Sequence, residues 1–221
     1  MARVEPRPTR VPLPDPAHAP AGNDLIAAGV SIDPALMLAG YRRGLFSMPI
    51  ADDLIGWFSP DPRGVLPLDQ LHVSRSLRRS LRRYTVTVNT DFAAVMAGCA
   101  DRTRPGHWIA PEFADCYLEL HRMGWAHSIE VRESDGKLAG GLFGVEVGGL
   151  FSGESMYHHG RDASKVAVVE LVRRLAAAPG PRLFDVQWST DHLRTLGVVD
   201  WSRHTYLTEL RAALTSPAIF S

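Results

Sequence analysis

Apolar residues recur along the chain at two spacings, one typical of amphipathic helices and one typical of strands. Spacings of three and four residues after capping residues such as Asp33 and Ser74 predict helices, and runs of β-branched or alternating apolar residues predict strands. Helices are predicted over residues 34–44, 74–83, 91–100, 111–123, 162–177 and 206–214, and strands over 85–88, 126–132, 137–147, 150–156 and 183–186. Strands joined by tight turns and followed by a helix and another strand indicate an α+β fold with a mixed sheet.

Prolines and turn residues divide the chain into three parts. Six prolines lie within the first twenty residues, so residues 1–21 are expected to form an extended arm or a disordered tail. The turn sequence SPDP at 59–62 marks a boundary between a small N-terminal domain, residues 22–60, and a main domain, residues 61–221.

Composition is that of an ordinary globular protein. Of 221 residues, 45% are hydrophobic and 22% are charged, and no apolar run reaches the roughly 18 residues of a membrane span. The N-terminus lacks the apolar stretch of a secretory signal, so we expect a cytoplasmic protein without membrane association. Neither the two cysteines, Cys99 and Cys116, nor the histidines have the spacing of metal ligands, and no metal site is predicted.

A block of positive charge stands out although the 24 basic residues balance the 24 acidic ones over the whole chain. Residues 71–90 contain no acid and five arginines, which are Arg75, Arg78, Arg79, Arg82 and Arg83. The planar guanidinium fork suits phosphate, so this predicted helix is a candidate for binding nucleic acid. The alternative is a solvated helix face whose acidic partners come from other segments.

Three polar residues lie inside apolar strand segments. Glu154 interrupts the strand that ends at Met156, and Asp185 and Gln187 lie two residues apart at the end of the last predicted strand. Polar groups are costly to bury without partners, so these side chains are site candidates; the alternative is that they point outward. Trp108 precedes a predicted helix and could stack on a nucleic-acid base, or it could be a core residue.

Seven short motifs occur in order along the chain, and together they resemble the bacterial leucyl/phenylalanyl-tRNA–protein transferase family. The resemblance extends from about residue 22 to residue 214. The motifs are YRRGLF at 41–46, WFSPDPR at 57–63, LHVSRS at 71–76, WI at 108–109, AHSIE at 126–130, GESM at 153–156 and ASK at 163–165.

The resemblance implies a small N-terminal α/β domain followed by a domain similar to the GCN5-related acetyltransferases. It implies transfer of leucine or phenylalanine, and less well of methionine, from tRNA to proteins with N-terminal Arg or Lys, which marks those proteins for N-degron degradation. No coenzyme is implied, and we expect a monomer. The residues that match the family's site are Glu154, Asp185 and Gln187 for catalysis, Phe151 and Met156 for the aminoacyl pocket, Trp108 for adenine stacking, and Arg75, Arg78, Arg79, Arg82 and Arg83 for tRNA.

The chemistry of the reaction suggests a role for each of the three polar site residues. We expect Asp185 to polarise the amide of Gln187, which would orient the attacking amine, and Glu154 to help hold the cationic N-terminal residue, while the proton passes to Asp185 or to water. Leu142 and Val168 are expected to complete the pocket lining. Two rival classes remain: a non-catalytic RNA-binding protein, and an acyl-coenzyme A N-acetyltransferase, against which Asp162 counts because it lies where a pyrophosphate would bind.

Overall fold

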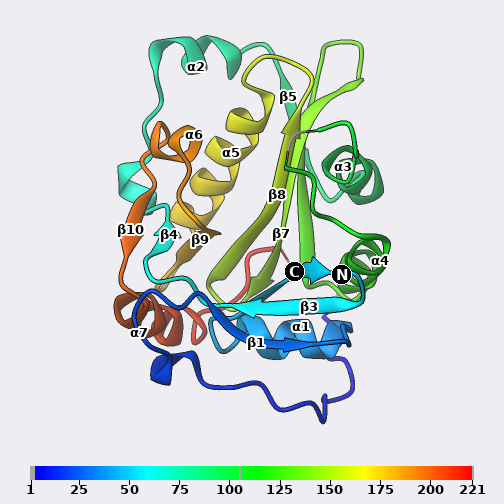
Figure 1. Cartoon of the computed structure of the whole chain (residues 1–221). Coiled ribbons are helices and arrows are strands. Elements are labelled where there is room, and N and C mark those ends of the chain that lie inside the picture. The colour runs from blue at the N-terminus through cyan, green and yellow to red at the C-terminus, as the bar shows by residue number, and fades with distance from the viewer. Residues whose placement is uncertain (1–2, 105, 221) are drawn as a thin grey trace.

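The protein, described by a computed structural model over residues 3–104 and 106–220, is built around one large sheet (Figure 1). Its seven strands are ordered β10–β4–β9–β8–β7–β6–β5, and all neighbours are antiparallel except β8 and β9, which are parallel. The mixed sheet predicted from the sequence is therefore confirmed. The strands are Arg63–Val65 (β4), Thr85–Val88 (β5), Ala126–Arg132 (β6), Leu138–Val147 (β7), Leu150–His158 (β8), Leu183–Gln187 (β9) and Val199–Trp201 (β10).

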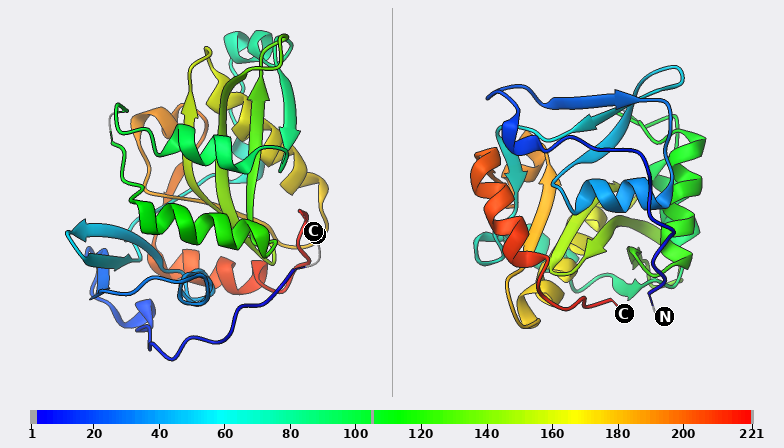
Figure 2. Two further views of the ribbon diagram at one scale, coloured as in Figure 1. Left: turned by 90° about the vertical axis from the view of Figure 1, so that its right-hand side faces the viewer. Right: turned by 90° about the horizontal axis from the view of Figure 1, so that it is seen from below.

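Helices cover both faces of the large sheet, α3 and α4 on one face and α5 on the other (Figures 1 and 2). The face under α3 and α4 contains buried aromatic residues such as Phe113, Tyr117 and Phe143, whereas aliphatic residues such as Leu171 and Leu175 fill the face under α5. None of the helices in the described residues is long and apolar enough to cross a membrane. The helices of this part are Arg75–Ser80 (α2), Phe92–Cys99 (α3), Pro111–Arg122 (α4), Ala163–Ala177 (α5), Asp191–Arg194 (α6) and Arg203–Ala213 (α7).

A smaller antiparallel sheet precedes the large one. Its strands Leu25–Gly29 (β1), Phe46–Ala51 (β2) and Leu54–Phe58 (β3) pair in the order β1–β3–β2. Helix α1, Pro34–Tyr41, begins as predicted, because the Asp33 carboxylate accepts a hydrogen bond from the Leu36 amide at 2.8 Å. Residues of α1 belong to the same hydrophobic cluster as the α3 and α4 face, so the small unit packs directly on the main one.

The proline-rich segment is an extended arm in the described residues, apart from a short 3₁₀ turn at Pro16–His18. The backbone of Val4 bonds the carbonyl of Met123 at 2.9 Å and accepts from the Trp125 indole at 2.8 Å. Arg3 pairs with the buried carboxylate of Glu146, which also accepts hydrogen bonds from the backbone of the C-terminal segment.

Several predicted boundaries are wrong, for local reasons. Helix α2 ends at Ser80 rather than at 83, because the amides of Arg82 and Arg83 bond carbonyls three residues back in a 3₁₀-like turn. Strand β8 continues to His158, and α7 starts at Arg203 because Ser202 caps it. Strands β1 to β4 and β10 and helix α6 were missed. All are short, and Pro49 within β2 is tolerated because β2 is an edge strand.

Candidate active site

Strands β8 and β9 part in the middle of the large sheet and leave an open cleft. They pair only as far as Ser152 and Asp185, after which β9 pairs with β4 alone while β8 runs on along β7. The cleft contains a cavity of about 130 Å³. Its lining comes from β7, β8, α5, β9 and α6: Leu142, Phe143, Gly153, Glu154, Ser155, Met156, Val168, Phe184, Val186, Gln187 and Leu193.

Glu154 enters the cleft at a bulge in β8. On the neighbouring strand β7, Phe143 lies opposite Ser155 and Gly144 lies opposite Gly153, so Glu154 is the extra residue. A bulge breaks the regular alternation of side chains and redirects the residue that it inserts. The strand pattern in the sequence therefore could not fix the direction of this side chain.

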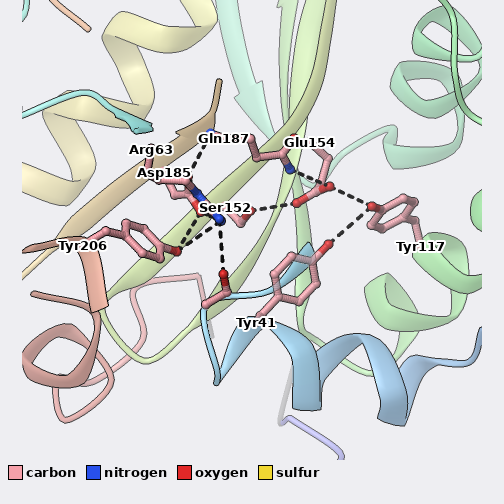
Figure 3. A network of polar contacts seen from close by, with 9 residues as sticks. Tyr41, Arg63, Tyr117, Ser152, Glu154, Asp185, Gln187 and Tyr206 are labelled. Carbon is pink, nitrogen blue, oxygen red and sulfur yellow. Dashed lines mark hydrogen bonds and ion pairs between the residues drawn. The ribbon is translucent and has the colours of Figure 1, made fainter. Parts of the chain in front are cut away.

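The Glu154 carboxylate is buried and accepts several hydrogen bonds. The hydroxyls of Tyr117 and Ser152 donate to it at 2.7 and 2.8 Å, and the Tyr41 hydroxyl lies 3.3 Å from that of Tyr117 (Figure 3). Burial raises the pKa of Glu154 above its ordinary value, although the hydroxyl donors oppose this shift. The group is therefore a better proton acceptor than an exposed glutamate.

Gln187 ends β9 in a strained backbone conformation. Its φ is +68°, the left-handed region that costs a residue with a side chain about 1–2 kcal/mol. The Asp185 carboxylate holds this conformation by accepting a hydrogen bond from the Gln187 backbone N–H at 2.8 Å. The side-chain Nε2 of Gln187 donates to Glu154 at 3.1 Å, no donor in the described residues bonds its Oε1, and the residue lines the cavity.

Asp185 is the centre of a buried ion pair. Arg63, on β4, donates to both carboxylate oxygens, at 2.9 and 2.5 Å, and the Tyr206 hydroxyl of α7 donates at 2.8 Å (Figure 3). Both charged side chains are only 1% exposed. The expected contact between Asp185 and the side-chain amide of Gln187 is not formed. Because the left-handed φ turns the Gln187 side chain toward Glu154, Asp185 contacts the backbone of Gln187 instead.

Three of the four expected pocket residues line the cavity. Leu142, Met156 and Val168 are among its lining residues, whereas Phe151 is not. The Phe151 ring is fully buried, with its centroid 6.0 Å from that of Phe184, which does line the cavity. Because Phe151 lies on the paired part of β8, before the strands part, it supports the cavity wall from behind.

Trp108 lies beside the cleft without lining its cavity. The indole is partly exposed and packs edge-on against Phe113 and Tyr117, with centroid distances of 5.7 and 6.4 Å. Tyr117 in turn donates to Glu154. Tyr117 therefore links the Trp108 indole to the buried carboxylate of Glu154.

Most arginines of the basic segment 75–83, which comprises α2 and the turn after it, are free of acidic partners. Leu77 anchors α2 to the core, and only Arg83 forms an ion pair among residues 3–104 and 106–220, with Glu133 at 3.1 Å. The others extend into solvent; these are Arg75, Arg78, Arg79 and Arg82. The alternative in which other segments neutralise the helix therefore holds for Arg83 alone.

Four residues around the cleft were not identified from the sequence as site residues: Tyr41, Arg63, Tyr117 and Tyr206. A signal existed for two of them, since Tyr41 and Arg63 fall within the motifs at 41–46 and 57–63. The other two lie on the inner faces of helices and resemble ordinary core residues. Within the described part of the chain, His, Cys, Asp and Glu side chains form no group that could hold a metal ion.

An apolar cavity with a few converging polar groups, one of them a buried carboxylate with a raised pKa, is typical of an enzyme active site. Comparisons with known proteins identify the family. The family model for leucyl/phenylalanyl-tRNA protein transferase matches residues 65–211, and the model for the N-terminal domain of the same proteins matches residues 31–61. The chain belongs to this family of aminoacyltransferases.

Individual relatives are similar over nearly the whole chain. A leucyl/phenylalanyl-tRNA–protein transferase of Dinoroseobacter shibae is 50% identical over 85% of this chain and 84% of its own length. One of Anaeromyxobacter is 45% identical over 96% of this chain and 91% of its own. Among solved structures, L-PGS of Bacillus licheniformis has 12% identity and a TM-score of 0.37 over 69% of this chain and 56% of its own.

Proposed function

We propose that the protein transfers leucine or phenylalanine, and less well methionine, from Leu-tRNA or Phe-tRNA to the α-amino group of proteins that begin with Arg or Lys. In this proposal the product is marked for N-degron degradation, and the domain formed by residues 61–221 is similar to the GCN5-related acetyltransferases. The names of the relatives support the donor and the protein acceptor. The reaction takes place in the cytoplasm, and the protein acts as a monomer without a metal or coenzyme.

The apolar cavity beside Glu154 and Gln187 is the observation that carries this proposal. Its volume of about 130 Å³ is close to that of an apolar cavity of about 150 Å³ that holds benzene, so a leucine or phenylalanine side chain fits. Side chains that are unbranched at Cβ can enter, whereas Ile and Val would place a methyl group at the mouth. Methionine enters as well, because a small change in an apolar side chain alters selectivity by only about 1–3 kcal/mol.

The polar side of the cleft supplies the chemistry for amide formation. The aminoacyl ester is already activated, so the enzyme aligns the reactants and removes a proton. Oε1 of Gln187 accepts a hydrogen bond from the acceptor amine and directs its lone pair at the ester carbonyl carbon. Glu154 takes one proton from the α-ammonium group, whose pKa of about 7.7–8.0 requires only a modest push. The C–N bond forms, the bond to the ribose oxygen breaks, and that oxygen leaves with the second proton.

Asp185 acts in this reaction as a positioning residue. Its carboxylate is occupied by Arg63, by Tyr206 and by the backbone of Gln187, so it has no free side toward the cleft. It holds Gln187 in the left-handed conformation that turns the amide toward Glu154. Of the two acceptors that the sequence left open, Asp185 and water, neither is required, because Glu154 lines the cavity and Asp185 does not.

The tRNA binds along the outer side of the molecule. The exposed arginines of α2 contact backbone phosphates, and the terminal adenine stacks on Trp108 beside the cleft. The negative charge of Glu154 attracts the positively charged N-terminal residue of the acceptor.

A transfer assay with labelled donors tests the proposal. Purified protein is incubated with Leu-, Phe-, Met-, Ile- or Val-tRNA and a peptide that begins with Arg, and separately with acetyl-coenzyme A. We expect label in the peptide from Leu and Phe, less from Met, and little from Ile and Val. A peptide that begins with Asp is the control and should remain unlabelled. Ile transfer equal to Leu transfer, or efficient acetylation, would contradict the proposal.

A further inference from the structure

A second cavity, of about 360 Å³, lies between α2, the first turn of α5 and the end of α6. It is next to the cleft, because Lys165 lines the second cavity and Val168, three residues further along α5, lines the first. Three residues of an α-helix span about 4.5 Å. The residues around the second cavity are His72, Ser74, Leu77, Lys165, Thr195 and Leu196.

The walls of the second cavity are fixed by contacts between distant segments. The His72 amide donates to the Leu196 carbonyl at 2.9 Å, which ties the segment before α2 to the end of α6. Leu77 is buried at the inner side, and the Ser74 hydroxyl caps α2 by accepting from the Leu77 amide at 3.2 Å. The cavity is therefore preformed rather than dependent on a mobile loop.

The second cavity is positively charged. Among residues 3–104 and 106–220, the only side-chain hydrogen bond of Lys165 Nζ is with the Thr195 hydroxyl, at 3.4 Å. The acid nearest along α5 is Asp162, which accepts from Ser80 at 2.9 Å and lies 3.8 Å from Arg161. The neighbouring His192 has a lowered pKa, first because of burial and then because of the positive charge of Lys165.

The positive charge continues from this cavity onto the exposed face of α2. Arg75 follows the cavity residue Ser74 directly, and Arg78 and Arg79 extend the surface away from the cavity. A single small anion would contact the cavity alone. A surface that combines a cationic cavity with a row of exposed arginines fits a ligand with several phosphates along one chain.

We infer that the second cavity binds a backbone phosphate of the tRNA, with Lys165 as its cation and His72 as a further hydrogen-bond donor. This inference rests on the proposed function, because it takes aminoacyl-tRNA as the ligand. It extends the RNA-binding surface from α2 across α5 and α6. The RNA would thus contact the same helix, α5, that lines the aminoacyl cavity.

Replacement of Lys165 tests the inference, and Lys137, the only other lysine in the sequence, provides a matched control. Lys165→Gln should raise the Kd for Leu-tRNA about tenfold, as expected for loss of a charged hydrogen bond. It should also reduce the slope of log K against log salt by about 0.7–0.9, the value for one phosphate contact. Lys165→Arg should restore binding. Lys137→Gln removes the same charge from an exposed residue that pairs with Asp135, and should leave binding unchanged.

The donor leucyl-adenosine separates a phosphate contact from a structural effect. It has no backbone phosphate, so Lys165→Gln should slow its transfer less than twofold. The inference is overturned if Lys165→Gln binds tRNA like Lys137→Gln, or if Lys165→Gln slows transfer from both donors equally. Binding is measured without turnover, so failure of the proposed reaction in the wild-type protein would be seen separately as tRNA binding without transfer.

Discussion

Replacement of Asp185 by Asn would leave the Arg63 guanidinium buried without a counter-charge. Both side chains are 1% exposed, and removing one partner of such a pair typically costs about 3–5 kcal/mol. For a protein of this size, each kcal/mol lowers Tm by about 2–4 °C. We therefore expect Asp185→Asn to unfold about 6–20 °C below the wild-type protein. Its transfer activity should fall as well, but that loss alone cannot separate instability from chemistry.

The double variant Arg63→Met/Asp185→Leu separates the two effects. Replacing a buried ion pair by apolar residues of similar volume is often neutral or stabilising, so the double variant should regain most of the lost stability. It still lacks the acceptor for the Gln187 backbone N–H, and the left-handed conformation at φ +68° loses its support. A displacement of about 1 Å in a reacting group costs on the order of 10²-fold in rate. We expect the double variant to be stable and to transfer leucine about 10²-fold more slowly.

Thermal unfolding followed by circular dichroism measures the first effect, and single-turnover transfer from Leu-tRNA measures the second. Affinity for tRNA is the control, and it should stay near the wild-type value in both variants because Arg63 and Asp185 form no hydrogen bond with α2, whose arginines are unchanged. A wild-type transfer rate in the double variant would refute the positioning role of Asp185. An unchanged Tm in Asp185→Asn would refute the stabilising role of the pair.

Three further predictions concern the cavity, the basic helix and Glu154. Met156→Ala should reduce transfer of leucine more than transfer of phenylalanine, because the smaller side chain cannot fill the enlarged cavity; rates with the two charged tRNAs at equal concentration decide this. Replacing Arg78, Arg79 and Arg82 by Gln should weaken tRNA binding and flatten its salt dependence, since fewer counterions are released; an unchanged slope would leave the helix as a solvated face. Burial raises the pKa of Glu154, and only the ionised form accepts a proton, so transfer should fall as the pH drops through a value above the ordinary glutamate pKa of about 4.3. Glu154→Gln should lose the limb set by Glu154, so that transfer is slow and falls instead below the α-ammonium pKa of about 7.7–8.0; an unchanged profile would exclude Glu154 as the proton acceptor.

The elements that the sequence predicts well are those with strong local patterns. Helix α5 and the hairpin of β6 and β7 were predicted within a residue or two, because α5 has a long apolar face and the two strands are joined by a clear turn. The strands of the small sheet were missed. They are five or six residues long, and β2 and β3 contain Pro49 and Gly56, which weaken any strand pattern.

The site was predictable as a set of residues but not as an arrangement. Glu154, Asp185 and Gln187 stand out because they interrupt apolar strands. Their directions depend on a bulge in β8 and on a left-handed residue at the end of β9, which no apolar pattern encodes. The partner of Asp185, Arg63, is 122 residues away in the chain. A pairing at this distance is fixed by the sheet order, which the spacing of apolar residues does not specify.

The two buried carboxylates of the cleft differ in what neutralises them. Asp185 has a permanent counter-ion in Arg63, and every direction around its oxygens is filled by the protein. Glu154 has hydroxyl and amide donors but no cation among the described residues, and burial raises its pKa accordingly. A buried carboxylate without a counter-ion favours binding either a proton or a cationic group. In the proposed reaction the acceptor's α-ammonium group supplies both, because it arrives as a cation beside Glu154 and leaves its proton there. The uncompensated charge of Glu154 would thus favour a positively charged acceptor and activate its amine.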